Sequence, residues 1–208
     1  MSLMISYDSL NELQLDVMRE IGNIGAGNAC TALSVLLGTA IDMSVPRVQL
    51  LSYESTAQKL GGEDNAVIGL QIEINGDLEG MMVHVVQKNF AQRIINTFYA
   101  KEITNIENLD EMDSSVLNGM ANITSGAYAN SIATLTSLLV NIGTPNQMTG
   151  KVSDVMKLPL TKFVKPGEQV LVVDEVFTID DEHISSNMIL ALESESLEKL
   201  FERLGVQV

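Results

Sequence analysis

The chain has 208 residues, enough for one large domain or two small ones, and its 46% hydrophobic content excludes a largely disordered protein. Its formal charge of −15 excludes the basic face that nucleic-acid binding needs, and it disfavours anionic membrane surfaces. The sequence contains no apolar run of about 18 residues, so no membrane span is predicted. It has a single cysteine and no visible secretory signal, which predicts a cytoplasmic protein without an internal disulfide.

A long helix is predicted over residues 8–37, with Asp8 or Ser9 as its N-cap. Its apolar residues recur at helical spacing, at Leu10, Leu13, Val17, Ile21 and Ile24. A bent strand or strand pair follows over 40–51, where Pro46 suits a sheet edge or a bulge. The remaining elements of this half are a hairpin, with strands at 66–74 and 78–86 around the turn 75–77, and an amphipathic helix at 88–98.

The second half of the chain is predicted to repeat this order. It comprises a long helix at 111–139, short strands near 140–144 and 152–163, a strand pair at 168–178 and 187–193, and a closing helix at 194–204. Adding 99 to a residue number pairs Asn23 with Asn122, Ile24 with Ile123, Gly27 with Gly126 and Pro46 with Pro145.

These matches predict an internal duplication. We expect one α+β domain over residues 4–208, with two pseudo-symmetric halves at about 4–105 and 106–208. Two long helices lying on a shared antiparallel sheet would bury both of their apolar faces. The histidines, His84 and His183, have no spaced ligands around them, and the acidic stretch at 174–182 lacks calcium-loop spacing, so no metal site is predicted.

The first helix carries three polar residues on one face. At about 100° per residue, Glu20 lies roughly 40° from Asp16, and Asn23 lies about 20° to its other side. This arc misses the apolar stripe, so the side chains are expected to point to solvent. From the spacing alone, an ordinary solvated helix face is the better explanation of these residues. If the residues are functional, they orient water, because neither the acid nor the amide is a good nucleophile at neutral pH.

Three glycines surround Asn23, at Gly22, Gly25 and Gly27. Each costs about 1 kcal/mol relative to alanine in a helix interior. Either another element packs closely here, or the backbone of a partner approaches. A Walker loop is excluded because no lysine followed by serine or threonine is present, and a dinucleotide fingerprint is excluded because no strand precedes the glycines.

These residues resemble the CheC, CheX and FliY phosphatase family. Its motif is Asp or Ser, three residues, Glu, two residues, Asn, then twenty-two residues and Pro, and this chain matches it at Asp16, Glu20, Asn23 and Pro46. The sequences at 76–80 and 200–205 are also similar to the family, closest to full-length CheC. The resemblance implies two long helices beside a mixed, largely antiparallel sheet, and hydrolysis of the aspartyl phosphate on the response regulator CheY.

The resemblance also implies roles for the matching residues. Asn23 would place a water molecule in line with the phosphorus, and Glu20 would pair with the active-site lysine of the receiver. The receiver would supply its own aspartate and magnesium ion, so this chain would need no cofactor of its own. The second copy of the motif is degenerate: Ser115, Asn122 and Pro145 match, but Gly119 stands at the glutamate position.

Two other functions stay open. A non-catalytic binding module, like the middle domain of the flagellar switch protein FliM, would share the fold, but Glu20 and Asn23 argue against it. An adaptor that regulates the deamidase CheD is the second. In the family, CheD contacts the segment after the second proline, and here the segment 146–154 lacks an acidic residue close behind Pro145, which argues against this partnership.

Overall fold

The computed structural model describes residues 5–44, 46–165 and 167–206. The first half contains η1 (Tyr7–Ser9), α1 (Glu12–Leu37), β1 (Ile41–Met43), β2 (Arg47–Leu51), α2 (Tyr53–Lys59), β3 (Ala66–Gly76), β4 (Gly80–Val86) and α3 (Lys88–Tyr99). The second half contains η2 (Ile106–Asn108), α4 (Glu111–Thr136), β5 (Val140–Ile142), β6 (Asn146–Lys151), α5 (Val152–Phe163), β7 (Val170–Ile179), β8 (Glu182–Leu192) and α6 (Ser194–Arg203).

The two long helices match each other in length and in the positions of their ends. Helices α1 and α4 have 26 residues each, and they begin at Glu12 and Glu111, which are 99 positions apart. Each begins with a capping box and ends at a residue in the left-handed conformation, Gly38 or Ser137. The 99-residue spacing seen in the sequence therefore extends to the bounds and caps of these helices.

The sheet joins the two halves by exchanging strands. Its order is β1-β7-β8-β4-β3-β5, and β2 also pairs with β7 while β6 pairs with β3. The first two strands of each half thus pair with the other half, and β4 meets β8 at the centre. The expected α+β fold, with two long helices beside a largely antiparallel sheet, is confirmed. Parallel pairs do not contribute to it, since every pairing among the described residues is antiparallel.

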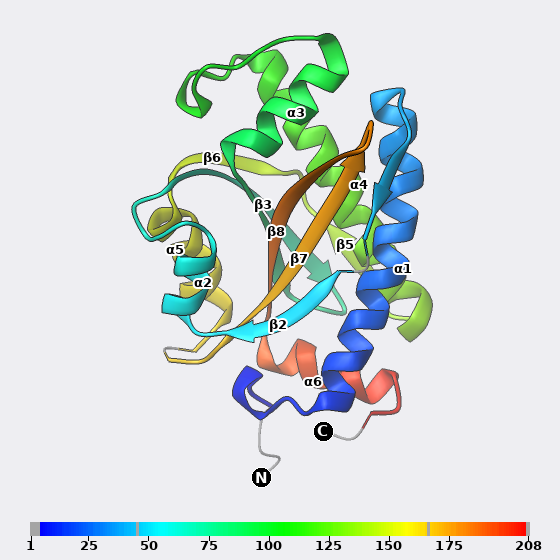
Figure 1. Cartoon of the computed structure of the whole chain (residues 1–208). Coiled ribbons are helices and arrows are strands. Elements are labelled where there is room, and N and C mark those ends of the chain that lie inside the picture. Colours follow the sequence, from blue (N-terminus) through cyan, green and yellow to red (C-terminus); the bar gives the residue numbers. More distant parts are fainter. Residues whose placement is uncertain (1–4, 45, 166, 207–208) are drawn as a thin grey trace.

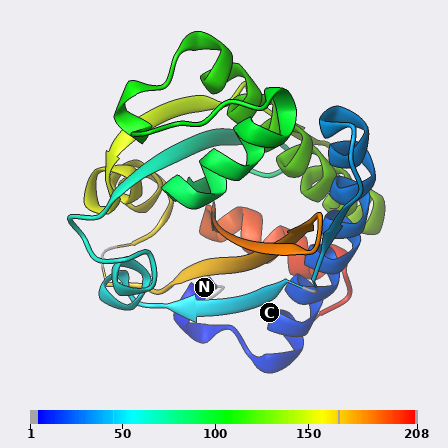
Figure 2. The ribbon, with the colours of Figure 1, turned by 45° about the horizontal axis from the view of Figure 1, so that its top comes forward.

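Helices cover both faces of this sheet. Figures 1 and 2 show α1 and α4 side by side on one face, and α2 and α5 on the other. Alternation along β3 follows this layering: Ile68, Leu70 and Ile72 pack in the core under α4, whereas Gly69 and Gln71 face Val155 of α5. Within the described part of the chain, no helix has the length and apolarity required to cross a membrane.

Residues 152–163 form a helix, so the strand predicted there is wrong. Its buried residues do have helical spacing, at Val152, Val155, Met156, Pro159 and Phe163. Pro159 lacks the amide hydrogen that would bind the carbonyl of Val155, and Gln71 Nε2 donates to that carbonyl at 3.4 Å. The hydrogen bond from Gln71 on a distant strand thus replaces the one that Pro159 cannot make. The local sequence of α5 does not reveal this contact. Helix α2, at the equivalent place in the first half, was not predicted either.

A cluster of buried polar side chains connects the helix layer to the sheet. Tyr128 Oη on α4 donates to Glu175 Oε1 on β7 at 2.8 Å, and His84 Nε2 on β4 is hydrogen-bonded to Ser125 Oγ at 2.8 Å. Burial raises the pKa of Glu175 to about 7 and lowers the pKa of His84 to about 4. Burial, together with Asp42 and Glu175, also raises the pKa of Cys30 to about 11.

Glu175→Gln is expected to become more stable relative to the wild type as pH rises. The folded wild type binds the Glu175 proton more tightly than the unfolded chain, so its stabilisation is present at acidic pH and is lost as pH rises through about 7. Glutamine keeps the acceptor for Tyr128 and does not titrate. Urea unfolding should find a gain of about 2–3 kcal/mol for the variant between pH 5 and pH 8.

The control is Glu102→Gln, which removes an exposed carboxylate from a loop. Its stability relative to the wild type should stay constant over the same pH range. The same constancy in Glu175→Gln would contradict a proton on Glu175 in the folded state.

Candidate functional site

The predicted motif lies in the first half of α1. Asp16 and Glu20 are exposed, as the helical spacing predicts. Asp16 forms an ion pair with Arg19, a partner that was missed although its spacing of three residues is visible in the sequence. Glu20 has no ion-pair or hydrogen-bond partner among the residues that the structure describes. A free carboxylate therefore faces the solvent one helical turn before Asn23.

Asn23 is only half-buried, so the expectation of a solvent-facing side chain holds in part. Its Oδ1 is shielded from solvent and lacks a hydrogen-bond partner. The amide is thus an acceptor without a donor inside the protein. A buried polar atom without a partner costs about 1–3 kcal/mol.

Pro46 is brought to the same end of the helix. It is buried, and a Cβ atom added at Gly22 would lie 3.8 Å from both Cβ and Cγ of Pro46. The proline therefore packs against the α1 backbone next to Asn23. This contact explains why Pro46 belongs to the motif although it lies far from Asn23 in the sequence. It gives Pro46 a packing role beneath the surface that carries Glu20.

The structure separates the two explanations for the glycines. At Gly25 an added Cβ would lie 2.6 Å from Cδ1 of Tyr128, so this glycine lets α4 pack closely on α1. At Gly27 no heavy atom lies within 4 Å of an added Cβ. Packing therefore requires Gly25 but not Gly27, which lies one turn beyond Asn23 on the same face.

The second motif lies on α4, around a shallow hollow of about 780 Å³. Ser115 and Asn122 are exposed, and both line this hollow together with Gly119 and Pro145. The four second-half positions predicted from the sequence are thus brought together. The carboxylate of Glu20 has no counterpart here, because Gly119 offers only its backbone.

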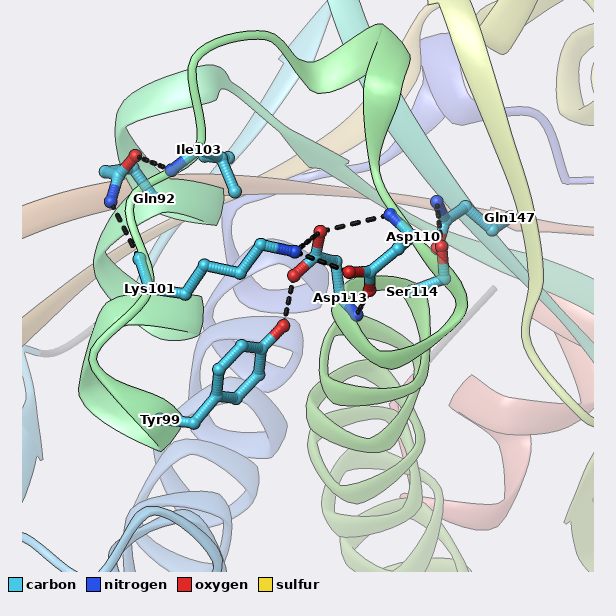
Figure 3. A network of polar contacts seen from close by, with 8 residues as sticks. All are labelled: Gln92, Tyr99, Lys101, Ile103, Asp110, Asp113, Ser114 and Gln147. Atoms are coloured by element: carbon cyan, nitrogen blue, oxygen red, sulfur yellow. Dashed lines mark hydrogen bonds and ion pairs between the residues drawn. The ribbon is translucent and has the colours of Figure 1, made fainter.

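A polar network fixes the start of α4 beside this hollow (Figure 3). Lys101 Nζ lies 2.6 Å from both Asp110 Oδ2 and Asp113 Oδ2, and the hydroxyl of Tyr99 also donates to Asp113. Burial opposes the charge on Asp113, but Lys101 and Tyr99 outweigh it, so the pKa of Asp113 is lowered. The network ties the end of α3 to the first turn of α4.

The side chains at these surfaces limit the chemistry. Across the described residues, no group of three or more His, Cys, Asp or Glu side chains is arranged to hold a metal ion. The first surface offers an exposed carboxylate at Glu20 and an amide at Asn23. These groups can bind a cation and orient a water molecule, but they do not supply a strong nucleophile.

The chain is similar to known proteins in sequence and in fold. The profile of the CheC-like family matches residues 13–50, which contain the whole first motif. The CheY-P phosphatase CheC of Bacillus subtilis is 32% identical over 207 residues, which are 97% of this chain and 99% of that protein. The chain belongs to the CheC-like family. The resemblance recognised from the motif is therefore confirmed.

Two solved structures support the fold of this CheC-like chain. FliY of Thermotoga maritima matches with a TM-score of 0.74 at 24% identity, covering 95% of this chain and 98% of that chain. The FliM middle domain from H. pylori matches with a TM-score of 0.69 at 11% identity, covering 93% and 99%. At these identities, both likenesses concern the fold alone.

Two alanine substitutions should have opposite effects on this CheC-like fold. Gly25→Ala is expected to lower the free energy of unfolding by about 1–2 kcal/mol, because the clash with the Tyr128 ring exceeds the gain in helix propensity. Gly27→Ala should raise it by about 1 kcal/mol, since the new methyl group meets no atom. Urea unfolding measures both. Equal stabilisation by the two changes would contradict the packing of Tyr128 on Gly25.

Proposed function

We propose that this CheC-like chain hydrolyses the aspartyl phosphate of a CheY-type receiver, with Asn23 positioning the attacking water and Glu20 fixing the docked receiver. The observation that carries the proposal is the pair itself. A partner-free carboxylate and an amide with an unpartnered oxygen lie one turn apart on the outer face of α1. The Bacillus subtilis relative is a CheY-P phosphatase, which supports the choice of substrate.

The reaction needs little from the enzyme beyond geometry. The water oxygen forms a bond to phosphorus as the bond from phosphorus to the aspartyl oxygen breaks. The products are inorganic phosphate and the free aspartate of the receiver, and the protons of the water pass to phosphate and solvent. An acyl phosphate is already reactive, so holding water in line supplies much of the acceleration.

Asn23 suits this role because its amide is free to turn. The carboxamide has an acceptor oxygen and an NH₂ donor, and its terminal torsion is broad. Its Oδ1 has no internal hydrogen bond to lose. When a receiver covers α1, rotation of the amide would bring Oδ1 outward to accept a hydrogen bond from the attacking water.

Glu20 suits the docking role because its carboxylate is exposed and uncommitted. It would pair with the active-site lysine of the receiver. The chain carries a charge of −15, so long-range attraction does not bring an acidic receiver to it. Recognition then depends on local complementarity, which a carboxylate facing a lysine provides. The receiver would also supply the magnesium ion that neutralises the phosphoryl group.

Asn23→Ala should reduce hydrolysis to the rate of the receiver alone, a loss of about 100-fold or more, because no group then orients the water. The variant should fold normally, since it removes a half-buried amide whose oxygen has no partner. The measurement is the decay of phosphorylated receiver, with a melting curve for the variant.

The matched control is Asn122→Ala, at the equivalent position of α4, which should leave the rate nearly unchanged. The assignment of the site would be wrong if the Asn122 change were the damaging one. Full activity in both variants would favour a binding module that shares the fold.

Glu20→Gln should raise KM about tenfold with little change in kcat, because the carboxylate contributes to binding rather than to the transition state. The KM of the wild type should rise with salt concentration, and this dependence should weaken in the variant. Glu111→Gln, which removes an exposed carboxylate at the start of α4, is the charge-matched control. A fall in kcat at unchanged KM would assign Glu20 to catalysis instead of docking.

A further inference from the structure

The side chain of Leu13 lies on the outer face of α1 and not in the core. Helical spacing placed Leu13 in one apolar stripe with Leu10 and Val17, and those two residues do pack against the core. Leu13 belongs to neither core cluster, and the residue is 60% exposed. The spacing therefore predicted the wrong side of the helix for this residue, and packing does not require an apolar side chain there.

Leu13 shares its face of α1 with Glu20. Seven residues correspond to about 700° of helix rotation, so the two side chains differ in direction by about 20°. They lie about 10 Å apart along the helix axis, and Asn23 lies about 15 Å from Leu13. The exposed ion pair of Asp16 and Arg19 stands between them. An apolar side chain, an ion pair, a free carboxylate and an amide thus follow one another on a single surface.

A receiver that docks on Glu20 and Asn23 is large enough to cover Leu13. A stable protein interface buries about 800 Å² on each partner, which corresponds to a disc of roughly 16 Å in radius. Along α1, Leu13 lies about 13 Å from the midpoint between Glu20 and Asn23. Val35, the other large apolar residue exposed on this fully described helix, is 81% exposed but lies about 20 Å from that midpoint. Docking would therefore bury Leu13 and leave Val35 in solvent.

We propose that Leu13 is the apolar docking anchor for the receiver, and that it selects receivers with an apolar side chain at the facing position. Burial of apolar surface is the main favourable contribution to most protein association, whereas an ion pair at an accessible surface contributes little. Leu13 thus supplies affinity, while Glu20 fixes the orientation of the docked receiver. The inference rests on the proposed function, because it assigns the same partner to the same face of α1.

The test replaces Leu13 with glutamine, which has a similar helix propensity but a polar end. For the phosphorylated CheY-type receiver of the same organism, KM should rise about tenfold at unchanged kcat, because Leu13 touches no reacting group. The ratio of the two KM values should not depend on salt, since no charge is removed, in contrast to Glu20→Gln. Leu13→Met keeps an apolar side chain and should retain the wild-type KM within about twofold.

Val35→Gln is the matched control, because it removes a more exposed apolar side chain from the outer side of the same helix. Its KM should equal that of the wild type. Binding is measured separately by calorimetric titration with receiver that carries beryllofluoride, a mimic of the phosphoryl group, and Leu13→Gln should raise Kd by the same factor as KM. Melting temperatures near that of the wild type would establish that the variants fold, as their exposed positions predict.

The outcomes separate this inference from the proposed function. An unchanged KM in folded Leu13→Gln overturns the anchor and leaves the function intact, and so does an equal rise in KM for Val35→Gln. A fall in kcat at unchanged KM also overturns the anchor, because Leu13 would then act on the reaction instead of on docking. A wild type that binds the receiver without accelerating hydrolysis overturns the proposed function alone, provided that Leu13→Gln weakens this binding. A wild type that neither binds nor hydrolyses overturns both.

Discussion

The structure depends on the close packing of α1 on α4 at Gly25 and Tyr128. The absence of a side chain at Gly25 lets the Tyr128 ring lie against the α1 backbone, and the hydroxyl of the same tyrosine reaches Glu175 of β7. One residue therefore sets both the helix–helix distance and the depth of the helix layer over the sheet. Because a ring held between backbone and carboxylate has little freedom, the outer faces of both helices are fixed relative to the core.

This packing turns a duplicated sequence into two separate surfaces. In Figure 1 the helices run in opposite directions, so the first half of α1 and the first half of α4 lie at opposite ends of the pair. Strand exchange in the sheet makes neither half a complete layer alone. The fold therefore preserves both surfaces together, whatever happens to the chemistry of either one. No heavy atom lies within 4 Å of a Cβ added at Gly119, so the fold does not require glycine at this position of α4.

Sequence periodicity predicted the parts of the fold that local rules determine. The long helices, the hairpin around Gly76 and the closing helix were found, although α1 begins at Glu12 with Asn11 as its N-cap and not at Asp8 or Ser9. One failure, and one contact that the sequence did not reveal, come from contact between distant residues. Pro159 is tolerated in α5 because Gln71 of β3 binds the freed carbonyl, and Pro46 returns to α1 from a distant position to pack at Gly22. Helical spacing predicts which way a side chain points, but it does not predict which distant residues will contact it.

Some of the buried polar atoms without a hydrogen-bond partner lie at the two motif surfaces, and others lie elsewhere, at Arg93, Thr97 and Glu175. A shielded amide oxygen without a donor occurs at Asn23 on the first surface, and others occur at Asn118 and Gln147 beside the second. Each is a cost that an apolar residue of similar size would avoid. Such local conflicts are expected where a partner completes the hydrogen bonding.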